Sequence, residues 1–428
     1  MNINYDVVVI GGGTAGVIAA IQAGRAHAKT LLIEKSEILG GTMTNAGVDF
    51  PGLFHAWTQQ IVKGIGWELV KKCVEEANLK MPDFSMQGQE GRGHNREQIK
   101  INPFIYSALC DEAIIDAGVT PLFHSMVASI ENIDDFKKIQ ICTKRGLKTV
   151  TTKVIIDCTG DANAVDIAGY EVYKSKECQP ATLICSFSGY DLNNINIDSL
   201  QKKYDDEVQK GNLEYTDIGW SKTQFNMGML NQAGNNANHI HINGIYADSS
   251  EGKTSFGIKG RKSILRLYRF LKKQPGFENL TIEYISPECG IRETNRIKGK
   301  KTITLDDYIS GRLWDDAVCY SFYPIDLHNE NKGNGLDKRD LKKGTVPSIP
   351  RGAMLPYNSE NIIVAGRCVS SDQLANSALR VQASCMAMGQ AAGAMGALAA
   401  LTNTEVSNVP IDSIYTLLEK HEAIFPNK

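Results

Sequence analysis

The chain has 428 residues, of which 42% are hydrophobic and 22% charged, and its formal net charge is −2. This is the composition of a folded globular protein with room for about two or three domains, and its weak charge argues against nucleic-acid binding. The 10 cysteines include no CxxC pair, which argues against a redox dithiol of that type, an iron–sulfur cluster or a four-ligand zinc site.

The first predicted element is a strand at residues 5–10, where YDVVVI is a continuous apolar run rich in β-branched side chains. Gly11, Gly13 and Gly16 follow at the spacing GxGxxG, and a small-residue helix is expected at 17–26. These glycines permit a tight turn, close approach of a pyrophosphate and close packing of the helix on the strand. The N–H groups at the start of the helix are suited to binding phosphates.

A second strand is expected at 30–33 and ends at Glu34, where a carboxylate should meet the two hydroxyls of an adenosine ribose. Because an acid favours a free 2′-hydroxyl, this unit fits FAD or NAD better than NADP. The glycine-rich loop at 40–47 suits backbone that passes tightly around a bulky ligand, although a plain connector has a similar composition.

The middle of the first domain alternates predicted helices and strands. The expected elements are helices at 56–77 and 104–117, an irregular loop at 82–97, a short strand near 120, a hairpin at 126–152 with its turn near 144–146, and a buried strand at 153–158. The last strand leads into Thr159 and Gly160, which leave room for a ligand, and Asp161 follows at the expected mouth of the sheet.

The composition changes after residue 170. Residues 171–345 are richer in polar and aromatic residues, and we interpret them as an α+β substrate domain, or cap, inserted into a domain formed by 1–170 and 346–428. The elements expected within the cap are helices at 197–211 and 260–274 and a strand at 239–242.

The C-terminal part is expected to return to the first domain. A short strand at 361–366 is followed by a long helix from about 379 to 401, and an amphipathic helix closes the chain. Residues 381–401 carry no charge, but their many alanines and glycines, together with Gln382 and Gln390, favour a buried helix over a membrane span. Interior glycines lower helix propensity, so this helix should lie very close to a strand or a ligand. The predicted fold class is α/β: a Rossmann-like parallel sheet with helices, a small β-hairpin excursion and the inserted cap.

Several motifs resemble those of one family of flavoproteins. They are IGGGTAG (10–16), Glu34, GGTMTNAG (40–47), DCTGDA (157–162), CGIRETNRI (289–297), PYNSENIIVAGRCVSS (356–371) and ALRVQASCMAMGQAAG (378–393). The set resembles the FAD-dependent oxidoreductases of the glutathione-reductase-like, two-dinucleotide-fold group, and especially an uncharacterised bacterial subgroup. The resemblance covers nearly the whole chain, but its cap motifs name no substrate.

The resemblance implies FAD as the cofactor. It assigns cofactor binding to Gly11, Gly13, Thr14, Ala15, Gly16, Glu34, Lys35, Gly40, Gly41, Thr42, Val127, Gly160, Asp161, Gly366, Arg367, Ala378 and Val381. The pair Gly366-Arg367 departs from the Gly-Asp pair that is commoner in the wider group. Noncovalent flavin is the default expectation, with His55 as a candidate attachment point. The chain has no second strand–GxGxxG–helix unit, so the substrate itself, or a donor that binds at the same face, should reduce the flavin.

Hydride transfer to flavin N5 requires groups that orient the substrate and accept its proton. Arg292 and Arg296 can bind a substrate carboxylate or another anion, or can form structural ion pairs. Asp326 and His328, two apart in an expected strand, suit an orienting acid and a base, but they also suit a structural pair. His241 and His94 are weaker candidates. No metal site is expected, because the 8 histidines form no ligand-spaced cluster with carboxylates.

The leading functional hypothesis is an FAD-dependent oxidoreductase that transfers a hydride between a small organic substrate and flavin N5. The alternatives are a flavin-binding electron-transfer protein that serves a protein partner, and NAD-linked chemistry without a flavin. The expected partner is a small-molecule substrate rather than nucleic acid or a membrane, and homo-oligomerisation is left open. The chain starts almost directly with a strand and shows no secretion signal, which favours a cytoplasmic location.

Overall fold

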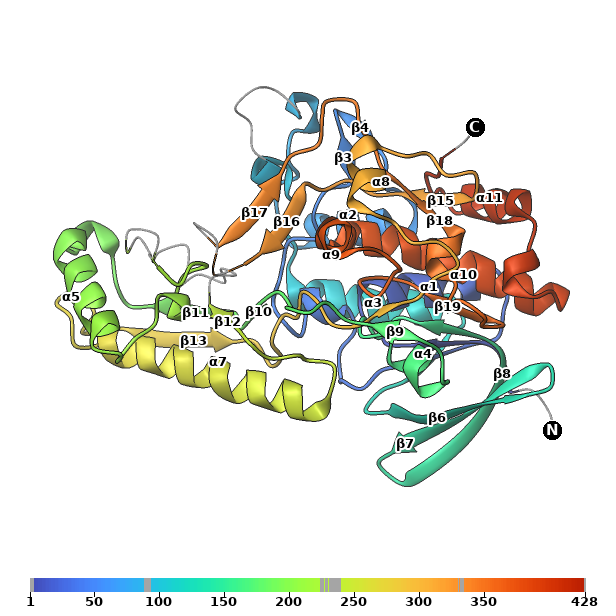
Figure 1. The fold of residues 1–428 in the computed structure, drawn as a ribbon, viewed down its shortest axis with the longest axis horizontal. Helices are drawn as coiled ribbons and strands as arrows, with labels where there is room; N and C mark the ends of the chain where they lie inside the picture. The colour runs from blue at the N-terminus through green and yellow to red at the C-terminus, as the bar shows by residue number, and fades with distance from the viewer. Residues whose placement is uncertain are drawn as a thin grey trace.

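The computed structural model describes residues 4–87, 94–223, 227, 230, 240–329, 331 and 335–426. Its centre is a seven-stranded sheet in the order β5-β2-β1-β8-β7-β6, with β19 also paired to β8 (Figure 1). The strands are β1 (Tyr5–Ile10), β2 (Thr30–Ile33), β5 (Thr120–Leu122), β6 (Met126–Ile133), β7 (Phe136–Thr143), β8 (Gly146–Asp157) and β19 (Ile362–Val364). Strands β5, β2, β1, β8 and β19 run parallel to one another. Strand β7 pairs antiparallel with both β8 and β6. The predicted α/β class with a parallel sheet is confirmed.

Helices α1 (Thr14–Arg25) and α10 (Gln382–Thr402) pack against each other and against the sheet. Glycines make this contact close: a Cβ on Gly389 would lie 2.3 Å from the backbone oxygen of Ala15, and one on Gly393 would lie 2.4 Å from that of Ala19. Gly389 and Gly393 of α10 therefore serve a helix–helix contact, whereas Gly396 makes the close approach to a strand that the sequence predicted, since a Cβ there would lie 3.1 Å from Ile156 Cδ1 of β8. Helix α10 has the length and hydropathy of a membrane span, but 83% of that stretch is buried inside the protein, and the prediction of a buried helix is confirmed.

Four predicted elements need correction. Residues 56–77 are not one helix: strands β3 (His55–Ala56) and β4 (Gln59–Gln60) come first, and α2 spans Ile65–Glu76. Positive φ at Trp57 and Thr58 makes the turn between β3 and β4, which apolar spacing cannot reveal. The single hairpin predicted at 126–152 is a three-stranded meander, because β6 and β7 turn at Asp134 and β8 runs on without a break to Asp157.

The other two corrections concern helix boundaries. The long C-terminal helix does not begin at 379: helix α9 (Gln373–Leu379) ends there, and α10 begins after a break at Arg380 and Val381. The cap helix predicted at 260–274 is α7, which begins earlier, at Ser250, where the Ser249 side chain accepts a hydrogen bond from Gly252 N–H. The other α-helices in the described part of the chain are α3 (Pro103–Asp116), α4 (Asn163–Ile167), α5 (Ile197–Gln209), α8 (Leu305–Ser310) and α11 (Ile411–Lys420).

A second hydrophobic core lies in the cap, at the left of Figure 1. Side chains from residues 181–280 form it, among them residues of α5, α7, β10 (Ala181–Thr182), β11 (Cys185–Ser188) and β12 (His241–Ile242), and Ile282 and Ile285 of β13 (Thr281–Ile285) pack against it. Residue 239 of the strand predicted at 239–242 lies outside the described residues, as do residues 88–93 of the loop predicted at 82–97.

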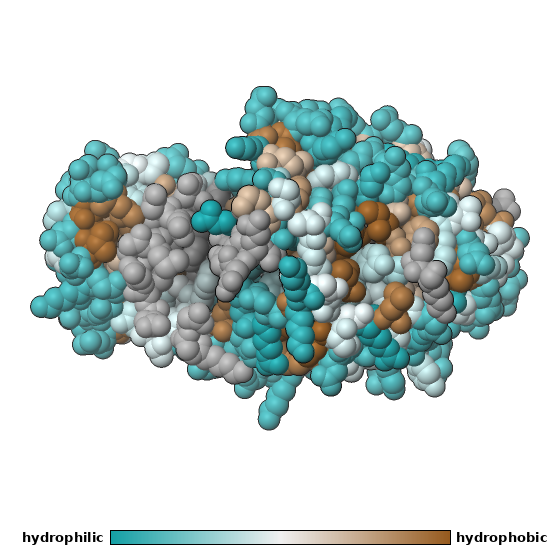
Figure 2. Space-filling model, turned by 90° about the horizontal axis from the view of Figure 1, so that it is seen from above, coloured by the Kyte–Doolittle hydropathy of each residue, from teal (hydrophilic) through white to brown (hydrophobic). Residues whose placement is uncertain are grey.

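Residues 303–349 pack in the largest core, together with α1 and α10. They include β15 (Ala317–Tyr320), β16 (Ile325–His328), β17 (Leu336–Arg339) and β18 (Ser348–Pro350); two short strands, β9 (Val172–Tyr173) and β14 (Arg296–Ile297), pair beside the sheet. The range 171–345 thus contains side chains of both cores, and its limits as a domain stay a prediction. Seen from above, hydrophilic residues cover most of the described surface, and hydrophobic ones lie in separate areas (Figure 2).

Candidate functional site

A cavity of about 1140 Å³ lies where the parallel strands end. Ile10 at the end of β1, Cys158 just after β8 and Ala365 just after β19 line it, so it occupies the crevice outside the carboxyl ends of the strands where open α/β sheets bind ligands. Its volume exceeds the roughly 300–1,000 Å³ of ordinary small-molecule pockets. The space suits a ligand as large as a dinucleotide together with a second small molecule.

One end of the cavity, which we call the glycine-turn end, is built by the turn between β1 and α1. Gly11 has a φ of 99°, and a Cβ there would lie 2.6 Å from the backbone oxygen of Cys158; a Cβ on Gly16 would lie 1.8 Å from that of Gly11. Packing therefore requires these two glycines. Gly13 differs: its φ is −76°, and the nearest non-adjacent atom to a Cβ would be Gly41 Cα, 3.9 Å away. Because Gly13 lines the cavity, a ligand that approaches the backbone explains this glycine better than packing does.

Glu34 lies at the end of β2 and lines the same end of the cavity. Its carboxylate accepts hydrogen bonds from Gly12 N–H at 2.6 Å and from the Ser36 N–H and hydroxyl at 2.8 and 2.7 Å. These bonds fix the carboxylate beside the glycine turn. The neighbouring Lys35 also lines the cavity and pairs with Glu288 of the cap side.

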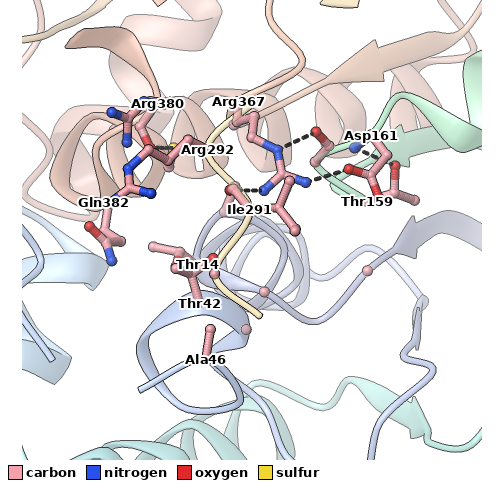
Figure 3. A pocket seen from close by; sticks show the side chains of 18 of the residues that line it. Thr14, Thr42, Ala46, Thr159, Asp161, Ile291, Arg292, Arg367, Arg380 and Gln382 are labelled. Carbon is pink, nitrogen blue, oxygen red and sulfur yellow. Dashed lines mark hydrogen bonds and ion pairs between the residues drawn. The ribbon is translucent and has the colours of Figure 1, made fainter. Parts of the chain in front are cut away.

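Arg367 ties three segments together beside this end (Figure 3). It donates to the backbone oxygens of Gly160 at 2.8 Å and Ile291 at 2.7 Å, and it pairs with Asp161. Asp161 also contacts Lys253 of α7, at 3.2 Å. Burial opposes ionisation, but Arg367 and Lys253 outweigh it and hold the pKa of Asp161 below its ordinary value. Arg367 stands where the wider group more often has an aspartate. It joins its own turn and the turn at Gly160 and Asp161 to Ile291 of the cap.

Most of the residues predicted to bind a cofactor line this cavity. Those that do are Gly11, Gly13, Thr14, Ala15, Glu34, Lys35, Gly41, Thr42, Val127, Gly160, Asp161, Gly366, Arg367 and Val381. Gly16, Gly40 and Ala378 are not among its lining residues. Gly16 and Gly40 shape the backbone behind the wall, where Gly40 N–H donates to Gly12 O at 3.0 Å, and Ala378 is fully buried in α9.

A second part of the cavity lining, which we call the cap end, consists of Arg292, Asp326, His328 and Arg380. Asp326 and His328 project from β16, Arg292 comes from the segment before β14, and Arg380 occupies the break between α9 and α10. His328 Nε2 lies 3.5 Å from Asp326 Oδ2, and Arg380 Nη2 lies 3.3 Å from the same oxygen. Figure 3 shows Arg292 and Arg380 close together, with Gln382 beside them.

Burial controls the charges at the cap end. Arg292 is 5% exposed, and burial and then the nearby Arg380 lower its pKa to about 9. Burial and then Arg292 lower the pKa of His328 to about 4, so its imidazole is neutral near pH 7. Burial opposes the ionisation of Asp326, but His328 and Arg380 hold its pKa far below the ordinary value. At neutral pH this cluster therefore contains two guanidinium cations and one carboxylate.

The contact with Asp326, at 3.5 Å, favours one tautomer of His328. Because a carboxylate accepts hydrogen bonds, the imidazole proton belongs on Nε2, and Nδ1 carries a lone pair. His328 Nδ1 is buried and has no hydrogen-bond partner among the described residues. A neutral histidine that is oriented by an acid and keeps a free acceptor nitrogen is arranged as a general base.

Arg296, predicted as a second anion-binding arginine, is a structural residue. Its Nη1 lies 2.7 Å from Glu293 Oε1, and the two side chains are only 4% and 1% exposed. It also donates to Ser175, and it does not line the cavity. The structural ion pair, which the sequence left open as the alternative, is the arrangement that the structure has.

The other predicted histidines occupy different places. His94 lines the cavity, and His241 lies behind its wall, with Nε2 3.4 Å from Arg292 Nη2 and its ring 5.0 Å from that of His328. His55 lies away from the cavity lining and stacks on Phe84 with ring centroids 3.8 Å apart. This position gives no support to His55 as a flavin attachment point.

Among the charged lining residues that the sequence analysis did not single out are Arg380 and Asp49. Arg380 is the last charge before the uncharged run 381–401, and a lone arginine at the start of a buried helix was a usable signal. Asp49 is 3% exposed and lies 3.7 Å from Lys100; burial raises its pKa to about 6 despite that lysine. Nothing in the sequence around Asp49 indicated this environment.

Comparisons with known proteins give the following matches. A family model described as FAD dependent oxidoreductase matches residues 6–418. The chain is 49% identical over 53 residues to dihydrolipoyl dehydrogenase of Trypanosoma brucei brucei, covering 12% of this chain and 11% of that protein. It is 39% identical over 84 residues to fumarate reductase (cytochrome) of Shewanella frigidimarina, covering 20% of this chain and 13% of that protein.

These alignments span much less than two-thirds of either relative. Among solved structures, a geranylgeranyl bacteriochlorophyll reductase-like protein from Thermoplasma acidophilum aligns with a TM-score of 0.44 and 14% identity. That alignment covers 98% of this chain and 84% of the other chain.

Proposed function

Because the chain belongs to the FAD dependent oxidoreductase family and FAD is its cofactor, we propose that it transfers a hydride between flavin N5 and a small organic substrate held at the cap end of the cavity. The observation that carries this proposal is the continuity of one cavity from the glycine turn at Gly13 to the buried base His328. An enzyme of this kind must hold a dinucleotide and a reacting molecule in one enclosed space.

The residues at the glycine-turn end fit FAD. Gly13 leaves a gap that its own packing does not require, and the N-terminus of α1 presents N–H groups suited to a pyrophosphate. Glu34 stands at the end of β2, where a ribose is bound in such folds. When bound, FAD supplies the ring system that accepts or donates a hydride.

At the cap end, side chains of the protein orient the substrate and handle its proton. His328 accepts a proton from a substrate O–H or N–H group at Nδ1 while a hydride leaves the adjacent carbon. Asp326 holds the imidazole in the required tautomer and stabilises the imidazolium that forms. Burial of the cluster limits the access of water. Since His328 is neutral at pH 7, it is in the form that can accept a proton when the substrate is oxidised.

Other expectations from the sequence belong to the same proposal. Assignment to the glutathione-reductase-like group, a cytoplasmic location and a small-molecule substrate as partner, with homo-oligomerisation left open, belong to this reading. The alternative is an electron-transfer protein that serves a protein redox partner. A buried base in the cavity favours small-molecule chemistry, because electron transfer between proteins needs no proton acceptor of this kind.

Anaerobic mixing separates the two readings. FAD-loaded protein would be mixed with small hydroxy acids, amino acids, sugars and polyols while the visible absorption of the flavin is followed. We expect bleaching by at least one class, and a rate about 10²–10⁴-fold lower in His328→Gln, as for loss of a general base. Absence of bleaching with every class, combined with rapid electron exchange with a redox protein, would establish the alternative.

A further inference from the structure

Helix α7 has two different sides. Its inner side packs in the core of the cap through apolar residues such as Phe256, Ile264, Leu267 and Leu271. The helix lies at the lower edge of the cap in Figure 1, and its outer side is exposed. At a rise of about 1.5 Å per residue, its 22 residues span roughly 33 Å. This is a long, straight surface that the proposed function does not use.

The charge on this helix is one-sided. Residues 252–273 contain eight lysines and arginines and no aspartate or glutamate, although the whole chain has a net charge of −2. Two of the eight cations have acidic partners: Lys253 lies 3.2 Å from Asp161, and Arg266 pairs with Asp217. The other six form no ion pair with the acids that the structure describes. Helix α7 therefore carries a local excess of positive charge.

Apolar side chains lie between these cations. The residues Ile258, Arg261, Lys262, Leu265 and Arg269 are three or four positions apart in turn or adjacent, so they share one side of the helix, which we call the outer stripe. All five are exposed, and the exposed fractions of Ile258 and Leu265 are 45% and 41%. A single exposed aliphatic residue is ordinary. Two of them, two helical turns apart among unpaired cations, form a mixed basic and apolar surface.

We propose that the outer stripe docks on the surface of a membrane that contains anionic lipids. Its cations are attracted to the negative headgroups. Ile258 and Leu265 then enter the boundary between headgroups and acyl chains, as the apolar residues of helices that lie flat on a membrane do. Nucleic acid fits this surface less well, because the outer stripe has no aromatic side chain on which a base could stack.

This inference departs from the partner expected from the sequence, which did not include a membrane. A net charge of −2 averages over the whole chain and hides a one-sided distribution. The cations of α7 are spread through the sequence at helical spacing, and only the helix brings them to one side. The inference goes beyond the proposed hydride transfer and does not depend on it, since no residue of the outer stripe lines the cavity.

Sedimentation with vesicles tests the inference. FAD-loaded protein would be mixed with sucrose-filled vesicles of phosphatidylcholine alone, or with vesicles in which one lipid in three is phosphatidylserine. We expect binding to the anionic vesicles and at least about tenfold weaker binding to the neutral ones, because these lack charges for the cations to meet. Raising the salt from about 0.1 M to about 1 M should weaken the binding, since the screening length falls from about 10 Å to about 3 Å.

Two double variants locate the surface. Lys262→Gln combined with Arg269→Gln should weaken binding to the anionic vesicles about 10- to 30-fold, because two cations near the headgroups are lost. The matched control is Lys342→Gln combined with Lys343→Gln, which removes the same net charge from exposed positions outside α7.

The apolar part of the outer stripe has its own variant. Ile258→Ser combined with Leu265→Ser should weaken vesicle binding at least about fivefold, since less apolar surface leaves water. Ile115→Ser, at a position on α3 that is 59% exposed, is the control and should bind like the unaltered protein. Flavin content and thermal unfolding would show that each variant is folded.

The outcomes are distinct from those of the proposed function. Equal binding to neutral and anionic vesicles, binding to neither, or unchanged binding in the variant of Lys262 and Arg269 would overturn the inference. Binding of double-stranded DNA without binding of anionic vesicles would also overturn it and would indicate a nucleic-acid surface. Binding to anionic vesicles by a protein whose flavin no small molecule bleaches would support the docking surface and refute the hydride transfer. If a variant does not fold, the comparison of the two vesicles with the unaltered protein decides.

Discussion

At the glycine-turn end of the cavity the wall is largely backbone, whereas at the cap end it is made of buried charged side chains. Gly11, Gly13 and Glu34 come from one short stretch, and each acts through conformation or a local hydrogen bond. Arg292, His328 and Arg380 come from three distant segments and act through charge. In the proposed function the glycine-turn end holds FAD, a cofactor that many enzymes share, and the cap end selects the substrate. Changes at the two ends should therefore have different effects.

The largest expected effect separates two glycines of the same turn. Gly13→Val should abolish FAD binding while the protein still folds, because the added side chain enters the cavity rather than the core. Gly16→Val should instead prevent folding, since its Cβ would lie 1.8 Å from the backbone oxygen of Gly11. Flavin content after purification and thermal unfolding by circular dichroism would be measured for both. A Gly13→Val protein that keeps its flavin would show that the cofactor is placed wrongly.

Next in size is the loss of the base at the cap end. His328→Gln should retain FAD and lower the rate of flavin reduction by the substrate about 10²–10⁴-fold. Stopped-flow absorption under anaerobic conditions measures that rate, and the flavin spectrum of the resting protein serves as the internal control. An unchanged rate would assign His328 to a structural role.

A third comparison concerns the two arginines four positions apart. Arg296→Met removes one partner of a buried ion pair and should destabilise the protein by about 3–5 kcal/mol. Below its melting temperature the variant should still retain FAD, since Arg296 does not line the cavity. Urea unfolding gives the free energy of unfolding, and the visible flavin spectrum gives the FAD content. Loss of FAD from a folded Arg296→Met protein would contradict the assignment of Arg296 as structural.

A smaller effect should appear in the dependence on pH. The pKa of His328 is lowered to about 4, so its base form is present above that pH and is lost as the pH falls through it. Flavin reduction by the substrate should therefore be nearly independent of this group between about pH 6 and pH 8 and should slow toward pH 4. A profile in His328→Gln that equals the wild-type profile would refute the assignment.

The smallest effect concerns Asp49. Its pKa in the folded protein is raised to about 6 by burial, so the folded state binds more protons than the unfolded state between the two pKa values. Stability should accordingly fall as the pH rises from about 4 to about 6. Asp49→Asn should remove that slope and raise the melting temperature at pH 7, whereas Asp116→Asn, at an exposed position, should do neither. Melting curves across this pH range provide the measurement.

Features that depend on consecutive residues were predicted more accurately than features that depend on backbone geometry or on contacts between distant residues. The strands at 5–10 and 30–33 have the predicted limits, since a buried strand is recorded in consecutive residues. The helix predicted at 56–77 was wrong, because positive φ at Trp57 and Thr58 is a backbone property that apolar spacing does not express. The Arg292–Arg296 pair could not be resolved either, since the choice between ligand and ion pair depended on where Glu293 lies in the folded chain.

The sequence by itself determined the dinucleotide end of this protein. The spacing of Gly11, Gly13 and Gly16 and the acid at Glu34 form a local pattern, and local backbone geometry is enough to build that end. Only the tertiary structure decided the cap end, because its charges come from segments that meet after folding. Burial then lowered the pKa of both Arg292 and His328, so that the arrangement of these ordinary side chains in a place of low dielectric constant sets their chemistry.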